Sequence, residues 1–202
     1  MSSLNDYKLS CELIDHSMGV RSVCAAEYLE SITFQDHKNF VCYLFYHETE
    51  HWLCSGSNDA TVCIYLENGG LMPISILKGY FSTVCSIASG VKKRSLITGN
   101  WDTTTRIWTI SEAGSFICVR KQTVWAVASM PKSKKFVTGA ADKNIFYWND
   151  KGEKLRVLKG HTDCVRGIFS LKNDCLVSCS HDATIRFWNA NGECLRQIGG
   201  HN

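Results

Sequence analysis

The sequence predicts an all-β fold assembled from one repeated unit. The first observation is a shared pattern, in which an aspartate is followed six positions later by Tyr or Trp; it occurs in 55–65, 98–108, 138–148 and 178–188. The second is the spacing of these aspartates, which recur every 40 to 43 residues at Asp59, Asp102, Asp142 and Asp182. A period of this length, filled with short strands, is typical of the blades of a β-propeller. We therefore expect a partial propeller of about four complete blades plus a half blade.

Each complete unit is predicted to contain four strands. An apolar first strand, as over 83–88 and 165–169, is followed by a second strand, as over 96–98 and 176–178. The aspartate turn leads into a third strand that ends at Tyr or Trp, and a more polar strand, as over 154–158, closes the unit. These runs are short, rich in β-branched residues and bounded by turn residues, as strands are. Pro73 and Pro131 fall at strand boundaries, where a missing N–H is tolerated.

The unit boundaries follow from a valine that recurs in the first strand. Its positions Val41, Val84, Val124 and Val165 are 43, 40 and 41 residues apart, whereas Val20 precedes Val41 by only 21. The predicted units are 1–34, which is incomplete, 35–76, 77–118, 119–157 and 158–198, with no second domain. Residues 28–34 resemble a fourth strand, and the strand over 7–14 is expected to close a ring. Seven blades would need roughly 280 residues, so we expect a fragment, a truncated isoform or an incomplete gene model.

Composition narrows the classes of function. The net charge of +3 does not by itself indicate nucleic-acid binding, and no apolar run is long enough to insert into a membrane. The first residues lack the apolar segment of a signal peptide, so a cytoplasmic and nuclear location is expected. Most of the 11 cysteines are then expected to be free thiols. Cys175, Cys179 and His181 lie close in sequence, but no second cysteine pair at ligand spacing accompanies them, so neither a metal site nor a cofactor is expected.

The last unit carries the complete signature of a WD-repeat propeller, namely His161, Ser178, Asp182 and Trp188. The matching residues of the other units are expected to be structural too: His37, Asp59, Asp102, Trp108, Asp142 and Trp148. A His, an Asp and a Ser could suggest a catalytic triad. Because the pattern recurs along the chain, we interpret these residues as ties between turn and strand, and we expect no catalytic residue and no enzyme. Tyr80 and Arg120 replace the histidine and Tyr65 replaces the tryptophan, so those blades should be less tightly held.

One face of the propeller is expected to bind a partner. It carries the residues before each aspartate and those beside each aligned valine, and the candidates are Phe40, Asn58, Trp101, Trp125, Arg166 and His181. Trp and Arg dominate the hot spots of protein interfaces. The alternative is that Trp101 and Trp125 pack on neighbouring blades. On the opposite face, the turns with Lys92–Arg94 and Lys132–Lys135 are either a basic patch or ordinary solvated turns.

Several strings are similar to one family. Residues 77–85, 95–104, 123–127 and 160–167 resemble the N-terminal propeller of the phospholipase A-2-activating protein family, most specifically at Trp101–Thr104 and Asp163–Gly167. The resemblance implies binding of ubiquitin or ubiquitylated proteins in protein turnover and sorting. It also implies contact with an AAA ATPase, through a C-terminal region absent here. We expect a non-catalytic ubiquitin-binding module; the alternatives are a generic protein-interaction scaffold or a truncated product without independent function.

Overall fold

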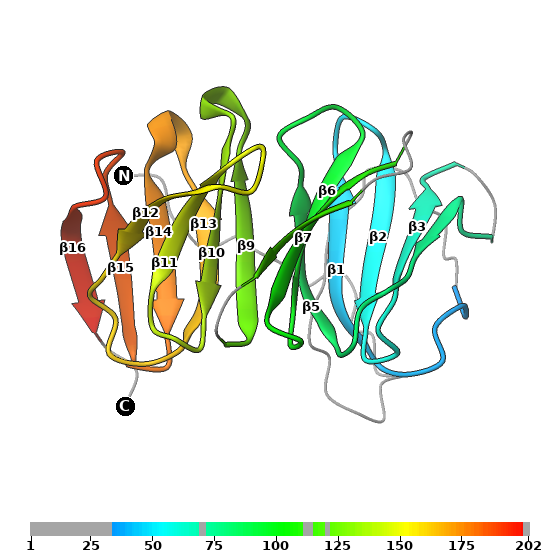
Figure 1. Cartoon of the computed structure of the whole chain (residues 1–202), viewed down its shortest axis with the longest axis horizontal. Coiled ribbons are helices and arrows are strands. Elements are labelled where there is room, and N and C mark those ends of the chain that lie inside the picture. The colour runs from blue at the N-terminus through cyan, green and yellow to red at the C-terminus, as the bar shows by residue number, and fades with distance from the viewer. Residues whose placement is uncertain (1–33, 69–71, 111–114, 120–121, 200–202) are drawn as a thin grey trace, which may run out of the picture.

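The structure is a computed structural model that describes residues 34–68, 72–110, 115–119 and 122–199. These residues form 16 strands arranged as four antiparallel sheets of four strands each (Figure 1). In every sheet the spatial order of the strands is their order in the chain, which is the topology of a propeller blade. The predicted partial all-β propeller is therefore confirmed. The expected strands over 7–14 and 28–34 lie outside the described residues, apart from Phe34, which belongs to no strand.

The first two blades occupy the right half of Figure 1. Blade 1 contains β1 (Val41–His47), β2 (Trp52–Ser57), β3 (Val62–Leu66) and β4 (Ser75–Leu77). Blade 2 contains β5 (Val84–Ser89), β6 (Ser95–Asn100), β7 (Thr104–Thr109) and β8 (Ser115–Val119). The predicted strands over 83–88 and 96–98 are thus confirmed within two residues at either end. Pro73 lies just before β4, at a strand boundary as expected.

The last two blades occupy the left half of the same view (Figure 1). Blade 3 contains β9 (Val124–Met130), β10 (Lys135–Ala140), β11 (Ile145–Asn149) and β12 (Lys154–Leu158), with the short 3-10 helix η1 (Pro131–Ser133) between β9 and β10. Blade 4 contains β13 (Val165–Ser170), β14 (Leu176–Ser180), β15 (Thr184–Trp188) and β16 (Cys194–Gly199), with η2 (Lys172–Asp174) between β13 and β14. The predicted strands over 154–158, 165–169 and 176–178 are confirmed.

The hydrophobic core lies between the blades. One buried cluster joins blades 1 and 2 and includes Trp52, Ile64 and Val84. A second joins blades 2 and 3 through Ile97, Val124 and Phe136, and a third joins blades 3 and 4 through Val137, Val165 and Trp188. Each first strand also contacts the first strand of the next blade, β1 with β5, β5 with β9 and β9 with β13. The aligned valines are therefore the residues that pack one blade onto the preceding one.

A glycine in each second strand makes this close approach possible. A Cβ atom on Gly56, Gly99 or Gly139 would lie 3.0, 2.9 or 2.6 Å from a Cγ atom of the valine that opens the next blade. The distances at Gly99 and Gly139 are too short for a real Cβ and the distance at Gly56 is unusually tight, so the side chain of the valine fills the space that each glycine leaves. Blade 4 has Cys179 at the same position, and there the thiol is exposed.

Candidate protein-binding face

The four aspartate turns have the same backbone shape. The residue after each aspartate has a positive φ: Ala60 (62°), Thr103 (71°), Lys143 (69°) and Ala183 (61°). Each aspartate carboxylate accepts the backbone N–H two residues later, at 2.9 to 3.1 Å. This local hydrogen bond is the characteristic turn of an Asx residue, and it holds the turn in the left-handed region at little cost. The repeated aspartates therefore fix the loops of one edge of the propeller.

In blade 4 the signature residues form one connected network. His161 Nδ1 lies 2.8 Å from an Asp182 oxygen, and its Nε2 lies 2.7 Å from Ser178 Oγ, which also accepts the indole N–H of Trp188 at 2.8 Å. Ser178 is only 1% exposed, so no substrate can reach its hydroxyl. The arrangement ties the turn to the strands and offers no accessible nucleophile. Blade 1 has the same pairs, with His37 2.9 Å from Asp59 and 2.8 Å from Ser55.

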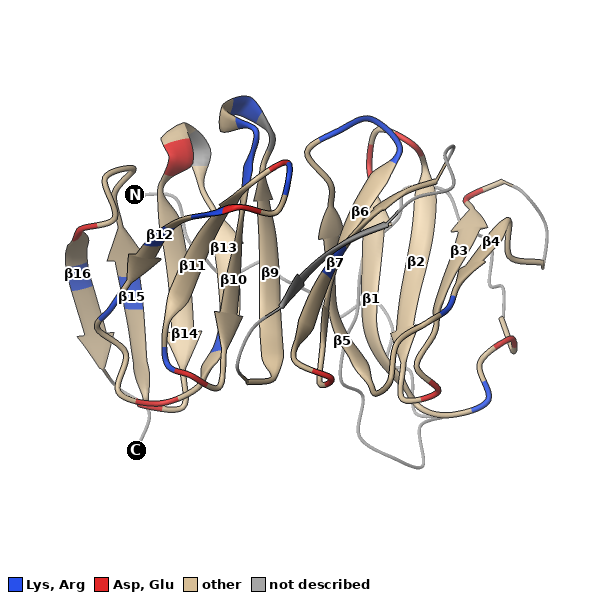
Figure 2. Ribbon diagram, viewed as in Figure 1, with Lys and Arg blue, Asp and Glu red and all other residues tan. Residues whose placement is uncertain are grey.

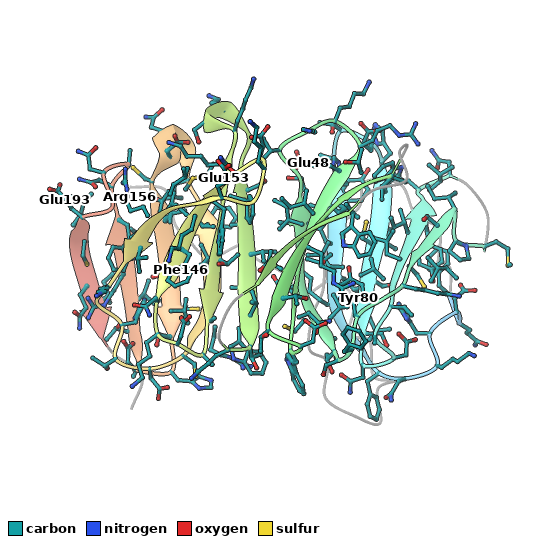
Figure 3. The ribbon with its side chains drawn as sticks, in the orientation of Figure 1. Glu48, Tyr80, Phe146, Glu153, Arg156 and Glu193 are labelled. Carbon is teal, nitrogen blue, oxygen red and sulfur yellow. The ribbon has the colours of Figure 1, made fainter. Side chains whose placement is uncertain are left out.

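Blade 2 keeps a network although its histidine is replaced. The hydroxyl of Tyr80 lies 2.8 Å from Thr98 Oγ1, which also accepts the indole N–H of Trp108 at 3.1 Å. The guanidinium of Arg106 lies 4.6 Å from the centre of the Tyr80 ring and pairs with Asp102 at 3.5 Å. Tyr80, labelled in Figure 3, thus takes over the contact with the threonine, and Arg106 takes over the contact with the aspartate. The replacement leaves neither Asp102 nor Thr98 without a partner.

Blade 3 shows part of the same pattern. The indole N–H of Trp148 donates to Thr138 Oγ1 at 2.9 Å, and Asp142 accepts the N–H of Asn144. Arg120, which stands at the histidine position of this unit, lies outside the described residues. Burial of Ser178, Thr98 and Thr138 shows that this row of hydroxyls belongs to the interior of the blades.

Backbone hydrogen bonds place the predicted binding residues at one edge. The residue before each aspartate donates its N–H to the carbonyl of the residue immediately before the first strand, at 3.0 Å in every blade. The pairs are Asn58 with Phe40, Trp101 with Thr83, Ala141 with Thr123, and His181 with Cys164. The six candidates Phe40, Asn58, Trp101, Trp125, Arg166 and His181 therefore lie along the same edge, which we call the docking face.

A β-bulge presents one side chain of each first strand toward this edge. The pairing with the second strand shifts by one residue just after the aligned valine in all four blades. The bulged residues are Cys42, Cys85, Trp125 and Arg166. Because a bulge re-aims the side chain that it carries, the residue type at these four positions can change the surface at this edge.

Three of the six candidates are in direct contact. The rings of Trp101 and Trp125 are 5.2 Å apart between centroids and meet edge to face at 66°. The guanidinium carbon of Arg166 lies 3.6 Å from the centre of the Trp125 ring. The row runs from blade 2 through blade 3 to blade 4, and Trp101 remains 37% exposed. The tryptophans pack on one another across blades and still leave an aromatic surface at the docking face.

The other three candidates lie at the two sides of this row. Phe40 is 53% exposed on blade 1. The side-chain oxygen of Asn58 accepts hydrogen bonds from Cys42 Sγ at 2.9 Å and from Thr83 Oγ1 at 3.0 Å, so it links blades 1 and 2. His181 is exposed on blade 4 beside Cys164. Asn58 therefore also positions the loops, whereas Phe40 and His181 are open to a partner.

Cys42 and Cys85 were not among the predicted residues, although they occupy the same bulge position as Trp125 and Arg166. The sulfur of Cys85 donates to the carbonyl of Val124 at 2.9 Å, and burial raises the pKa of its thiol to about 12. Cys85 is therefore a neutral thiol that links blades 2 and 3 beneath the tryptophans. Its offset of one residue from the aligned valine was the signal that could have identified it.

The opposite edge carries charges of both signs. The basic turn between β5 and β6 and the basic residues around η1 lie at the upper edge of Figure 2. Glu48 and Glu153 lie near the same edge (Figure 3), and the guanidinium of Arg94 stacks 5.5 Å from the ring of Trp52. A role for these basic turns stays a prediction. Among the described residues, no helix is long and apolar enough to cross a membrane.

Comparison with known proteins supports the repeat assignment. The family described as WD domain, G-beta repeat, matches residues 29–65, 71–109, 114–149 and 152–189. These four segments cover well over half of the chain. Each begins close to the start of a predicted unit and ends at or next to the Tyr or Trp of the third strand.

Individual relatives include proteins named for ubiquitin. The chain is 30% identical over 158 residues to phospholipase A-2-activating protein of Xenopus laevis, covering 62% of this chain and 20% of that protein. It is 30% identical over 132 residues to ubiquitin fusion degradation protein 3 homolog of Caenorhabditis elegans, covering 61% of this chain and 15% of that protein. It is 32% identical over 135 residues to ubiquitin homeostasis protein lub1 of Schizosaccharomyces pombe, covering 54% and 18%.

The resemblance drawn from the sequence strings is thus confirmed, and it concerns a limited part of those proteins. The match spans about a fifth of the length of these three relatives, or less. WD repeats are scaffolds for protein–protein interaction, and the docking face has the aromatic and cationic residues that such scaffolds use. On the strength of the four matched repeats, this chain belongs to the WD40-repeat family.

Proposed function

We propose that this chain is a non-catalytic ubiquitin-binding WD-repeat module that acts in ubiquitin-dependent protein turnover and sorting. The observation that carries the proposal is the row Trp101–Trp125–Arg166 on the docking face. The choice of partner is supported by the names of two relatives, ubiquitin fusion degradation protein 3 homolog and ubiquitin homeostasis protein lub1.

The physical character of the row suits a protein partner. Trp and Arg are enriched at hot spots because they combine a large apolar area with directed polar groups. The row is fixed by contacts between blades, so little conformational entropy is lost when a partner covers it. The exposed ring of Phe40 extends the apolar surface toward blade 1.

The proposal also includes the cellular location of the module and its other partners. We place it in the cytosol and nucleus, and we assign any contact with an AAA ATPase to a C-terminal region outside these 202 residues. No nucleic-acid binding and no insertion into a membrane are proposed.

The test is a titration of 15N-labelled ubiquitin with the purified 202-residue chain, followed by NMR. Saturable shifts confined to one surface of ubiquitin are the expected result. The chain must first be shown by sedimentation to be monomeric and by circular dichroism to be folded. If a folded monomer causes no shifts, the ubiquitin proposal is wrong and a generic protein-interaction scaffold remains.

A further inference from the structure

Blade 4 brings together three side chains of the kinds that bind zinc. Asp163 and Cys164 lie in the loop before β13, and His181 lies in the turn between β14 and β15. One carboxylate oxygen, the thiol sulfur and one ring nitrogen all lie within 4.8 Å of one another. In the part of the chain that the structure describes, no other group of three such ligands is found. Oxygen, sulfur and nitrogen donors of these types form tetrahedral zinc sites with comparable separations.

The two loops are held together by the backbone of the repeat. The N–H of His181 donates to the carbonyl of Cys164 at 3.0 Å. The hydroxyl of Ser180 donates to the carbonyl of Asp163, also at 3.0 Å. The three candidate ligands therefore project from a frame that exists before any ion binds.

In blades 1 and 2 the same two loops are held together without these side chains. Blade 1 has Asn39, Phe40 and Asn58 at the three positions, and blade 2 has Ser82, Thr83 and Trp101. The corresponding backbone contacts are still present, since the carbonyl of Asn39 accepts from Ser57 and that of Ser82 accepts from Asn100. Asp163, Cys164 and His181 are thus not required by the architecture of a blade.

We propose that Asp163, Cys164 and His181 bind one zinc-type divalent cation at the docking face of blade 4, with water completing the coordination. The sulfur of Cys164 has a long contact with the carbonyl of Ala141 at 3.9 Å and a hydrogen bond with the Asp163 carboxylate, so two of the candidate ligands already face one another. The ring of His181 is exposed, and Asp163 lies fully at the surface, so both can orient toward the ion.

Charged side chains around the cluster act on any ion that binds there. The carboxylate of Asp163 attracts a cation, whereas the positive charges of Lys143 and Arg166, which also act on this cluster, oppose one. Binding would replace the proton of the Cys164 thiol by the metal and release that proton to solvent.

The experiment is a titration of the reduced 202-residue chain with Co2+ as a spectroscopic substitute for Zn2+. A thiolate–cobalt charge-transfer band that saturates at one equivalent, and that Zn2+ then removes, is the expected result. Absence of such a band in the folded chain overturns the proposal. Because the readout is metal binding alone, its failure would leave the ubiquitin proposal untouched.

Variants can be taken from the other blades, which guards against simple loss of folding. Thr83 and Asn58 show that the frame accepts Cys164→Thr and His181→Asn, and Asn39 shows that it accepts Asp163→Asn. Cys164→Thr should abolish the band, and the other two should weaken binding at least about 10-fold. Cys179→Ser, which removes an exposed thiol on β14, is the matched control and should leave the titration unchanged. A band that survives Cys164→Thr would assign the metal to other thiols and overturn the proposal.

Discussion

The guanidinium carbon of Arg166 lies 3.6 Å from the centre of the Trp125 ring, across the boundary between blades 3 and 4. A cation over an indole face is attracted by the negative electrostatic potential that the ring quadrupole creates there. In the described part of the chain Arg166 forms no salt bridge that would compete. Trp125 in turn contacts Trp101. The row Trp101–Trp125–Arg166 is therefore built from one side chain of each of three blades.

Substitution of this row should weaken ubiquitin binding. Trp101→Ala or Trp125→Ala removes a central aromatic side chain, and the expected loss of about 2 kcal/mol corresponds to roughly 30-fold in Kd. NMR titration or calorimetry measures the change. Leu155→Ala on the outer strand β12, which also removes an exposed apolar side chain, is the control and should leave the affinity unchanged. Equal affinity of the folded tryptophan variants would show that ubiquitin does not dock on this row.

The network of blade 2 should be sensitive to Arg106. The side chains of Arg106 and Asp102 are each only 6% exposed, so Arg106→Met leaves a buried carboxylate without its cation. The expected decrease in the free energy of unfolding is about 3 kcal/mol, measured by urea denaturation. Tyr80→Phe removes a single hydrogen bond and should cost about 1 kcal/mol.

The exposed Arg156 supplies the comparison for this prediction. Arg156→Met makes the same chemical change on the surface of β12 and should alter stability by less than about 1 kcal/mol. If Arg106→Met costs no more than Arg156→Met, the pair of Arg106 with Asp102 does not hold the turn of blade 2.

The two signature histidines should respond to pH in opposite ways. Burial and the guanidinium of Arg186 lower the pKa of His161, against the effect of Asp182. Burial also lowers the pKa of His37, but hydrogen bonds with Cys63 and Asp59 outweigh it and raise the value to about 8. Cys63 and Arg186 occupy the same position of the repeat, four residues after the aspartate. The two blades therefore differ at this position, where Cys63 is a hydrogen-bond partner of His37 and Arg186 places a positive charge near His161.

The consequence for stability follows from these directions. His37 binds its proton more tightly in the folded state, so its contribution to stability is complete below pH 6.5 and is lost as the pH rises through about 8. His161 binds its proton less tightly, so its contribution is present above pH 6.5 and is lost as the pH falls below that value. NMR titration of the two imidazoles checks both directions. Arg186→Cys should raise the pKa of His161, and an unchanged or lower value would show that Arg186 is not the cause.

A glycine in a strand should be intolerant of an added methyl group only where the next blade packs against it, as happens on the second strands. Gly139→Ala would place its Cβ 2.6 Å from Val165 Cγ1 and 2.9 Å from Ile168 Cδ1. The resulting overpacking should lower the free energy of unfolding by about 1–3 kcal/mol. Gly199→Ala, with no atom within 4 Å of the new Cβ, is the control and should be close to neutral in thermal denaturation. Similar melting of both variants would contradict tight packing of Val165 on blade 3.

Much of the fold could be predicted because the turns and strands of a WD repeat are specified by residues that are close together in the sequence. An aspartate followed by a residue that adopts positive φ specifies the turn, and alternating apolar residues specify strands on either side. The roles of Asp59 and Asp182, and the strand that ends at Trp188, are visible in the sequence for that reason. Replacements within the network were harder to interpret, because a pattern shows that Tyr80 is not a histidine but does not show that Arg106 lies against it.

By itself, the sequence determined the order of the four strands in each complete blade, the spacing of the blades and the edge on which Trp101, Trp125 and Arg166 lie. Only the tertiary structure decided which of these side chains touch. It also brings Asp163 and Cys164 next to His181, which is 18 and 17 residues away in the chain. The physical reason is that strand periodicity and turn chemistry act between near neighbours. Contacts between blades depend instead on how a bulged residue is re-aimed and how closely a valine packs against a glycine about 25 to 30 residues earlier in the chain.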